Sequence, residues 1–174
     1  MYLPICGFDA KNAILCPQCE ARLDSGKITK SDVDASIKLA QLGKSNTQID
    51  KFTLTKCEKL DNDYLLYLSK YDINTIRQSR ILYRLIQDSF TGKIWLVESG
   101  CGYKKFIEDL FFPTKIISIN TVWIPGGIQK TRVIISGRWT NRFPININKV
   151  IKIVKSTQNL DIEIEFEESS RKPK

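Results

Sequence analysis

The order of predicted helices and strands occurs twice along the chain, and this repeat limits the fold more than any other feature of the sequence. Residues 29–99 predict a helix, two strands, a helical region and a third strand. Residues 100–168 predict the same order, without an obvious repeat of the amino-acid sequence itself. A chain of 174 residues with this pattern is expected to be an α+β protein with two units of similar topology.

Apolar periodicity and turn residues define these elements. The predicted helices are 29–42, 73–90 with an interruption near 77–80, 103–112 and 147–158. The predicted strands and turns are "IDKFTLTKCEKL" (49–60), "DND" (61–63), "YLLYLS" (64–69), "TGKIWLVES" (91–99), "KIISINTVWI" (115–124), "PGG" (125–127), "QKTRVIIS" (129–136) and "LDIEIEFEE" (160–168).

The start of the first predicted helix is marked by residues that can cap it. Thr29 or Ser31 can cap it, and Asp32 and Asp34 then fall in its first turn. Small hydroxyl side chains accept hydrogen bonds from the free backbone N–H groups at a helix start, and acidic residues there complement the helix dipole. Gly43 is expected to end this helix.

The net charge of +8 is unevenly distributed. Residues 1–50 contain six Lys or Arg and six Asp or Glu, whereas residues 70–155 contain 15 basic and five acidic residues, a net charge of 15 − 5 = +10. A basic region of this size is typical of a protein that binds a polyanion. Solvated surface charge in a lysine-rich chain is the alternative explanation.

Enzymatic activity finds no support in the sequence. The chain contains no histidine, which removes the commonest general base, the usual catalytic triads and histidine-based metal sites. No phosphate-binding or dinucleotide-binding glycine motif is present. We therefore expect a protein without catalytic residues and without a small-molecule substrate.

Three of the five cysteines lie in "CGFDAKNAILCPQC" (6–19). The pattern Cys6-x2-Asp9-x6-Cys16-x2-Cys19 has the spacing of a small zinc knuckle in which a carboxylate replaces one thiolate, and zinc accepts both ligand types. We expect a structural zinc ion held by Cys6, Cys16 and Cys19, with Asp9 as the fourth ligand and Cys57 as the alternative. A zinc-free ribbon and a redox-active Cys-x-x-Cys pair are the other interpretations.

The expected cellular compartment follows from the lack of a leader and of a membrane-spanning segment in the sequence. No basic-then-apolar leader opens the chain, and no apolar run approaches the length that spans a bilayer. We expect a cytoplasmic protein that does not contact membranes.

Three segments resemble archaeal NusA-like transcription factors, which contain tandem KH domains. "DYLLYLSKYDINTIRQSRILYRLIQDSFTGKIWLVES" (63–99) is similar to their first KH unit, and "KKFIEDLFFPTKIISIN" (104–120) to the opening of their second. "AILCPQCEARLDSG" (13–26) is similar to an N-terminal zinc knuckle found in related chains. The resemblance implies a zinc-knuckle segment, two KH-like units of the prokaryotic α-β-β-α-β type and a disordered tail, at residues 1–28, 29–99, 100–168 and 169–174.

KH domains clamp the RNA backbone with a GxxG loop between two helices. Here the corresponding positions are Arg77-Gln78-Ser79-Arg80 in the first unit and Phe143-Pro144-Ile145-Asn146 in the second, so the glycines are missing from both. Arginine side chains can contact phosphates in place of backbone N–H groups. The predicted RNA-binding residues are Arg77, Gln78, Ser79, Arg80, Arg84, Arg138, Trp139 and Arg142.

The three tryptophans have different expected roles, because one lies in a predicted loop and two lie on predicted strands. Trp139 lies in the basic loop "SGRWTNRF" (136–143), where an aromatic ring can stack on a base. Trp95 and Trp123 lie on predicted strands, where burial in the core is the commoner role.

The resemblance implies an RNA-binding factor for transcription elongation or termination, with RNA and RNA polymerase as its partners. The alternative is an adaptor without RNA binding, whose degenerate KH-like units dock on RNA polymerase or the ribosome.

Overall fold

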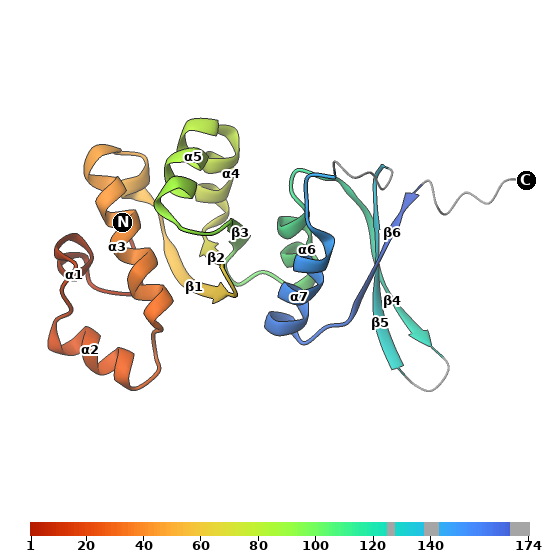
Figure 1. Cartoon of the computed structure of the whole chain (residues 1–174), viewed down its shortest axis with the longest axis horizontal. Helices are drawn as coiled ribbons and strands as arrows, with labels where there is room; N and C mark the ends of the chain where they lie inside the picture. The colour runs from red at the N-terminus through yellow and green to blue at the C-terminus, as the bar shows by residue number, and fades with distance from the viewer. Residues whose placement is uncertain (125–127, 138–142, 168–174) are drawn as a thin grey trace, which may run out of the picture. The chain divides into compact units, whose positions relative to one another are not determined.

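The structure is a computed structural model that describes residues 1–124, 128–137 and 143–167. It divides into two compact units, Met1–Gly100 and Cys101–Lys174 (Figure 1). The described residues form helices and two three-stranded sheets, which confirms the expected α+β class. Among them, no helix is both long enough and apolar enough to cross a membrane.

The first unit contains one sheet in the order β1-β2-β3. Strand β1 (Leu54–Leu60) pairs antiparallel with β2 (Asp63–Leu68), and β2 pairs parallel with β3 (Ile94–Glu98). The turn between β1 and β2 contains Asp61 at a φ of 53°, in the left-handed region that Asp tolerates. The predicted hairpin is therefore present.

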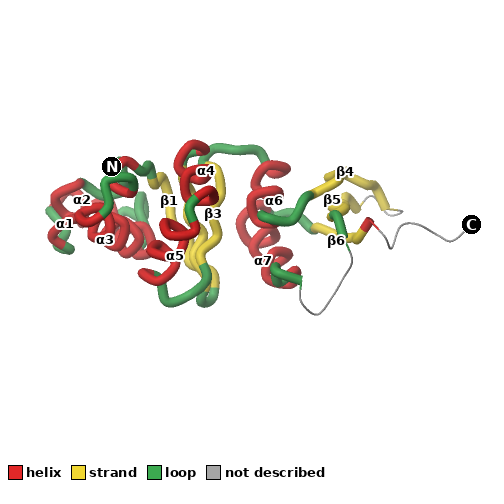
Figure 2. Tube along the Cα trace, turned by 90° about the horizontal axis from the view of Figure 1, so that it is seen from above, coloured by secondary structure: helices red, strands yellow, loops and turns green. Residues whose placement is uncertain are grey.

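Helices α3 (Lys30–Ser45), α4 (Lys70–Gln78) and α5 (Arg80–Ser89) pack against this sheet, and Figure 2 shows helices and strands as separate layers. The interruption predicted near 77–80 is a true break, because Ser79 alone separates α4 from α5. Alternate strand residues face the helices, as the two-residue period of a strand requires. The shared core includes Leu39, Leu54, Leu66, Leu68, Ile76, Leu82, Ile86 and Leu96.

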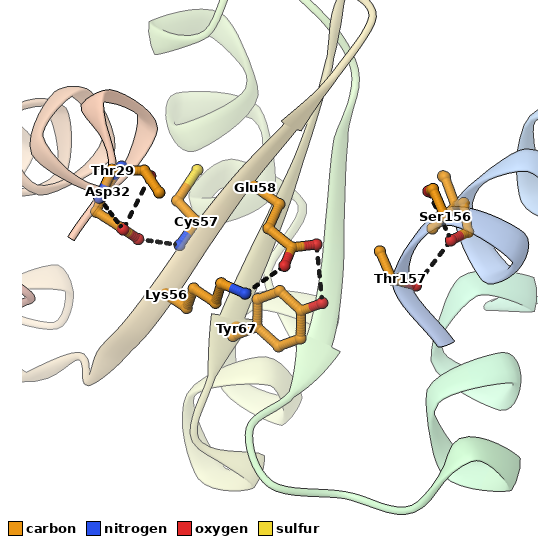
Figure 3. Close-up of polar contacts among 9 residues, drawn as sticks. Thr29, Asp32, Lys56, Cys57, Glu58, Tyr67, Ser156 and Thr157 are labelled. Carbon is orange, nitrogen blue, oxygen red and sulfur yellow. Dashed lines mark hydrogen bonds and ion pairs between the residues drawn. The ribbon is translucent and has the colours of Figure 1, made fainter. Parts of the chain in front are cut away.

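Two buried aspartates bind this helical layer to β1 and to the residue that precedes it. Asp32 Oδ1 accepts the backbone N–H of Cys57 at 2.6 Å, and its Oδ2 accepts Thr29 N at 2.7 Å (Figure 3). Asp72 Oδ2 accepts the backbone N–H of Thr53 at 2.8 Å. Each aspartate is the third residue of its helix. Its carboxylate therefore binds the residue that caps the helix and also a backbone N–H group distant in sequence.

The N-terminal residues pack on the face of α3 that points away from the sheet. Ile5, Ala10, Cys19 and Ile28 form a small buried cluster with Ala40 of α3. Residues near Met1 also reach the sheet, since the Tyr2 backbone forms hydrogen bonds with those of Phe52 and Leu54. Residues 1–28 therefore lie within the first compact unit.

The second unit repeats the order with fewer described helices. Helix α6 (Tyr103–Phe111) precedes the antiparallel pair β4 (Ile116–Ile124) and β5 (Ile128–Ile135), and α7 (Ile147–Gln158) precedes β6 (Ile162–Phe166), which pairs parallel with β5. The buried apolar residues include Phe106, Leu110, Val133, Val150 and Val154. The predicted turn at 125–127 and the predicted tail at 169–174 lie outside the described residues.

We predict that Asp32→Asn lowers the free energy of unfolding of the first unit by about 1–3 kcal/mol, because an amide cannot accept all the hydrogen bonds that reach this buried carboxylate. Urea unfolding followed by Trp95 fluorescence, with Trp123 and Trp139 replaced by Phe, measures the change. Asp34→Asn is the matched control: Asp34 forms a partly exposed ion pair with Lys38, and its loss should cost less than about 1 kcal/mol. Equal stability of the two variants would contradict the assigned role of Asp32.

Candidate metal centre

Two short helices bring four candidate ligands together near the N-terminus. Cys6 is the N-cap of α1 (Gly7–Asn12), and Cys16 is the N-cap of α2 (Pro17–Asp24). Asp9 and Cys19 are the third residues of these helices, so each Cys-x-x-ligand pair occupies the same positions of its helix. The three thiol sulfurs and one carboxylate oxygen all lie within 4.8 Å of one another. These are the residues that the sequence predicted as metal ligands.

Backbone N–H groups at the helix starts point at these side chains. Cys16 N donates to Asp9 Oδ2 at 2.9 Å, and Cys6 N donates to Cys19 Sγ at 3.4 Å. Asp9 N donates to Cys6 Sγ at 3.5 Å. Donors in these positions stabilise thiolate and carboxylate ligands, and they orient them toward a common centre.

The environment of Asp9 Oδ1 is the best evidence that the four candidate ligands fit a cation. Asp9 is fully buried, and among the described side chains its Oδ1 is a buried oxygen without any hydrogen-bond partner. An unsatisfied buried acceptor costs about 1–3 kcal/mol. The equivalent aspartate of α3, Asp32, uses both of its oxygens in hydrogen bonds. A cation among the three thiols would satisfy Asp9 Oδ1.

The protonation of the metal-free site supports the same interpretation. The backbone N–H of Cys16 and then the Cys19 thiol lower the pKa of Asp9 to about 2, so this residue is a carboxylate at neutral pH. Burial and then Asp9 raise the pKa of Cys19 to about 12, so this thiol is protonated when no cation is present. A bound divalent cation deprotonates a coordinating thiol, and metal binding should therefore release protons.

Cys57 was the alternative fourth ligand, and the structure places it elsewhere. It lies on β1, fully buried in the apolar core of the first unit that also contains Ala35 and Leu39. Burial raises its pKa to about 12. The structure therefore puts Asp9, and not Cys57, beside the three thiols.

The residues predicted to bind RNA in the first unit lie around the junction of α4 and α5. Ser79 ends α4 and caps α5, and its hydroxyl accepts Leu82 N at 3.3 Å. Arg80 and Arg84 are exposed, one turn apart on α5. Arg77 is partly buried, and its guanidinium donates to the Leu96 carbonyl at 3.4 Å.

The structure describes none of the residues predicted to bind RNA in the second unit. Arg138, Trp139 and Arg142 lie outside the described residues. Asn146, the last residue of the segment that replaces the second GxxG loop, caps α7 by accepting Lys149 N at 3.2 Å.

Sequence reasoning missed three exposed apolar side chains. Trp123 was expected in a core, but it is 72% exposed, and that expectation was wrong. Ile81 and Leu85 lie in the helix that apolar periodicity predicted over 73–90, yet they are 74% and 40% exposed on α5. The signal for Trp123 was its place two residues before the "PGG" turn, at the turn end of the predicted hairpin.

Comparison with known proteins does not identify a family. No family model and no curated protein matches the chain. Among solved structures, the crystal structure of APE1850 matches 74% of this chain and 95% of that chain, with 16% sequence identity and a TM-score of 0.42. A likeness at this level supports no conclusion about function.

We predict that the purified protein holds about one zinc ion per chain, and that Cys16→Ser and Asp9→Asn each reduce this content because each removes one of four ligands. Elemental analysis measures the metal. Cys101→Ser, which changes a thiol outside the cluster, should keep it. In Cys16→Ser, amide hydrogen exchange should accelerate in residues 1–28 but not in β1–β3. A metal-free preparation with protected amides in α1 and α2 would contradict the prediction.

Proposed function

We propose that this chain is a non-enzymatic RNA-binding protein of the NusA-like type, built from a zinc-binding N-terminal segment and two KH-like units. The observation that carries the proposal is the order and pairing of elements in the two units. In each, a helix precedes an antiparallel hairpin, and the third strand returns parallel to the second after one or two described helices. This order agrees with the KH-like resemblance of residues 63–99 and 104–120.

The α4–α5 junction is the proposed RNA contact of the first unit. A KH domain holds the RNA backbone between two helices, and here one residue, Ser79, joins them. The exposed Arg80 and Arg84 can reach phosphates with their side chains, so close approach of the backbone is not required. Arg77 contributes less, because its guanidinium already binds the Leu96 carbonyl.

Zinc is the proposed ion of the N-terminal site. Three thiolates and one carboxylate form a four-ligand set that suits its tetrahedral preference, and softer ligands dominate the set. Cys6, Asp9, Cys16 and Cys19 would hold the ion. Its role would be structural, because four protein ligands leave no open position for a substrate.

A protein-docking adaptor is the second candidate function. Ile81 and Leu85 are exposed one turn apart on α5, beside Arg80 and Arg84. Contiguous exposed apolar side chains mark interaction surfaces, and arginine is enriched in protein interfaces. RNA polymerase or the ribosome would then be the partner, and RNA would not be bound by the first unit.

We predict that Arg80→Ala/Arg84→Ala weakens binding to single-stranded RNAs of mixed, A-rich and U-rich sequence alike, because phosphate contacts carry little sequence information. The slope of log affinity against log salt should become shallower by about 0.7 for each phosphate that the variant no longer neutralises. Fluorescence anisotropy with labelled RNAs at several salt concentrations measures both effects.

The control for this experiment is Lys51→Ala, which removes an exposed cation from the 3₁₀ helix Ile49–Lys51 and leaves both α4 and α5 unchanged. It should leave affinity and slope nearly unchanged. An arginine double variant with wild-type affinity and slope would argue against RNA binding at this junction. If Ile81→Ser/Leu85→Ser then abolished binding to RNA polymerase, the adaptor would be the better account.

A further inference from the structure

Strand β4 lies at one edge of the sheet of the second unit. The strand order is β4-β5-β6, so among the described strands β4 pairs with β5 alone (Figure 2). Residues 118–124 pair one for one with β5, and the register shift of β4 lies before them, between Ile116 and Ser118. In an antiparallel pair, alternate residues of an edge strand direct their N–H and C=O groups away from the partner strand. β4 therefore presents a regular row of these groups on its open side.

The other edge strands of the two sheets carry charges or have backbone groups that side chains cover. On β3, the Ile94 N–H and the Leu96 carbonyl are hydrogen-bonded to side chains of α5 and α4. On β1, the N–H of Cys57 donates to a buried aspartate of α3. β6 is short and contains Glu163 and Glu165. Features of this kind keep an edge strand from pairing with another chain.

None of these protections is found on β4. Its residues, Ile116–Ile124, include no charged residue and no proline. In the part of the chain that the structure describes, no hydrogen bond joins residues 116–123 to any element other than β5. A long uncharged edge with open hydrogen-bonding groups is a template for pairing with another strand. Pairing with a further strand would satisfy these groups.

The side chains of β4 fit a second copy of the same strand. An antiparallel pair of identical strands has a two-fold axis, so every contact in it occurs twice. Ile117 and Trp123 are 44% and 72% exposed, and they lie three residues before and three residues after Asn120. With Asn120 at the axis, Ile117 of each copy lies opposite Trp123 of the other. Opposed aromatic and β-branched side chains stabilise a pair of strands.

The charge of the second unit sets how such a pair responds to salt. Residues 101–174 contain 13 basic and seven acidic residues, a net charge of 13 − 7 = +6. Two copies therefore repel each other at low ionic strength, and salt screens this repulsion. Association of two copies should become tighter as salt is added, whereas binding of a polyanion should become weaker.

We propose that two copies of this chain associate by antiparallel pairing of β4 with β4, with Asn120 at the two-fold axis. The two three-stranded sheets then join into one sheet of six strands. A two-fold contact closes on itself, so dimers form and longer assemblies do not. The inference goes beyond the proposed function and does not depend on RNA binding.

Sedimentation velocity of the nuclease-treated full chain over a series of concentrations measures the monomer–dimer equilibrium. Asn120→Lys and Asn120→Asp each place two like charges opposite each other at the axis, so each should raise the Kd of the dimer by about 2-fold to 5-fold. A mixture of these two variants places unlike charges there and should associate more tightly than either variant alone. Trp123→Ser removes two contacts with Ile117 and should raise the Kd by up to about 30-fold.

Asn148→Lys and Asn148→Asp are the matched controls, because Asn148 is an exposed asparagine on α7 and not on β4. They should leave the Kd nearly unchanged. Recovery of association in the mixture of Asn120 variants also shows that both variants are folded.

A parent protein that stays monomeric at every concentration would overturn this inference and leave the proposed function as it stands. A dimer that the Asn120 and Trp123 variants leave unchanged would overturn it too, because the interface would then lie elsewhere. Assemblies larger than a dimer, or association seen only before nuclease treatment, would also count against pairing through β4.

Discussion

A buried carboxylate at the third position of a helix is the interaction on which the first unit depends. Asp9, Asp32 and Asp72 each occupy this position, and each accepts a backbone N–H from a separate segment: Cys16, Cys57 and Thr53 respectively. Burying a carboxylate is costly unless it is hydrogen-bonded, so each of these contacts favours one arrangement of the helix and the distant segment. Two of the three segments belong to β1 or the residue just before it, and this strand consequently joins α3 and α4.

The candidate metal centre is a modification of this same arrangement. Thr29 and Ser69 cap α3 and α4 with hydroxyl oxygens, whereas Cys6 caps α1 with a sulfur atom. The substitution of a thiol for a hydroxyl places a soft ligand beside the third-position carboxylate. The start of α2 then adds two more thiols, and Asp9 keeps one oxygen free of hydrogen bonds. The helix cap and the third-position carboxylate of α1, together with the two thiols of α2, thereby form a set of four candidate ligands.

Local patterns predicted much of the fold, and long-range contacts account for most of what they missed. The α+β class, the first hairpin and the break near Ser79 follow from periodicity and turn residues within short windows. The choice between Asp9 and Cys57 depends on how α1 and β1 are placed in space, which no short window contains. Trp123 was misassigned because alternation along β4 says nothing about which part of the hairpin β6 covers by pairing with β5. The four ligands were predictable because their spacing is local, even though their convergence depends on two helices.

We infer that Asp9, and not a fourth sulfur, completes the candidate metal centre at the N-terminus. X-ray absorption spectroscopy of the zinc-loaded protein tests this most directly, because sulfur and oxygen ligands differ in bond length and scattering. We predict three sulfur ligands at about 2.3 Å and one oxygen ligand at about 2.0–2.2 Å. A first shell of four sulfur atoms, or one of two sulfur atoms completed by solvent oxygens, would contradict it.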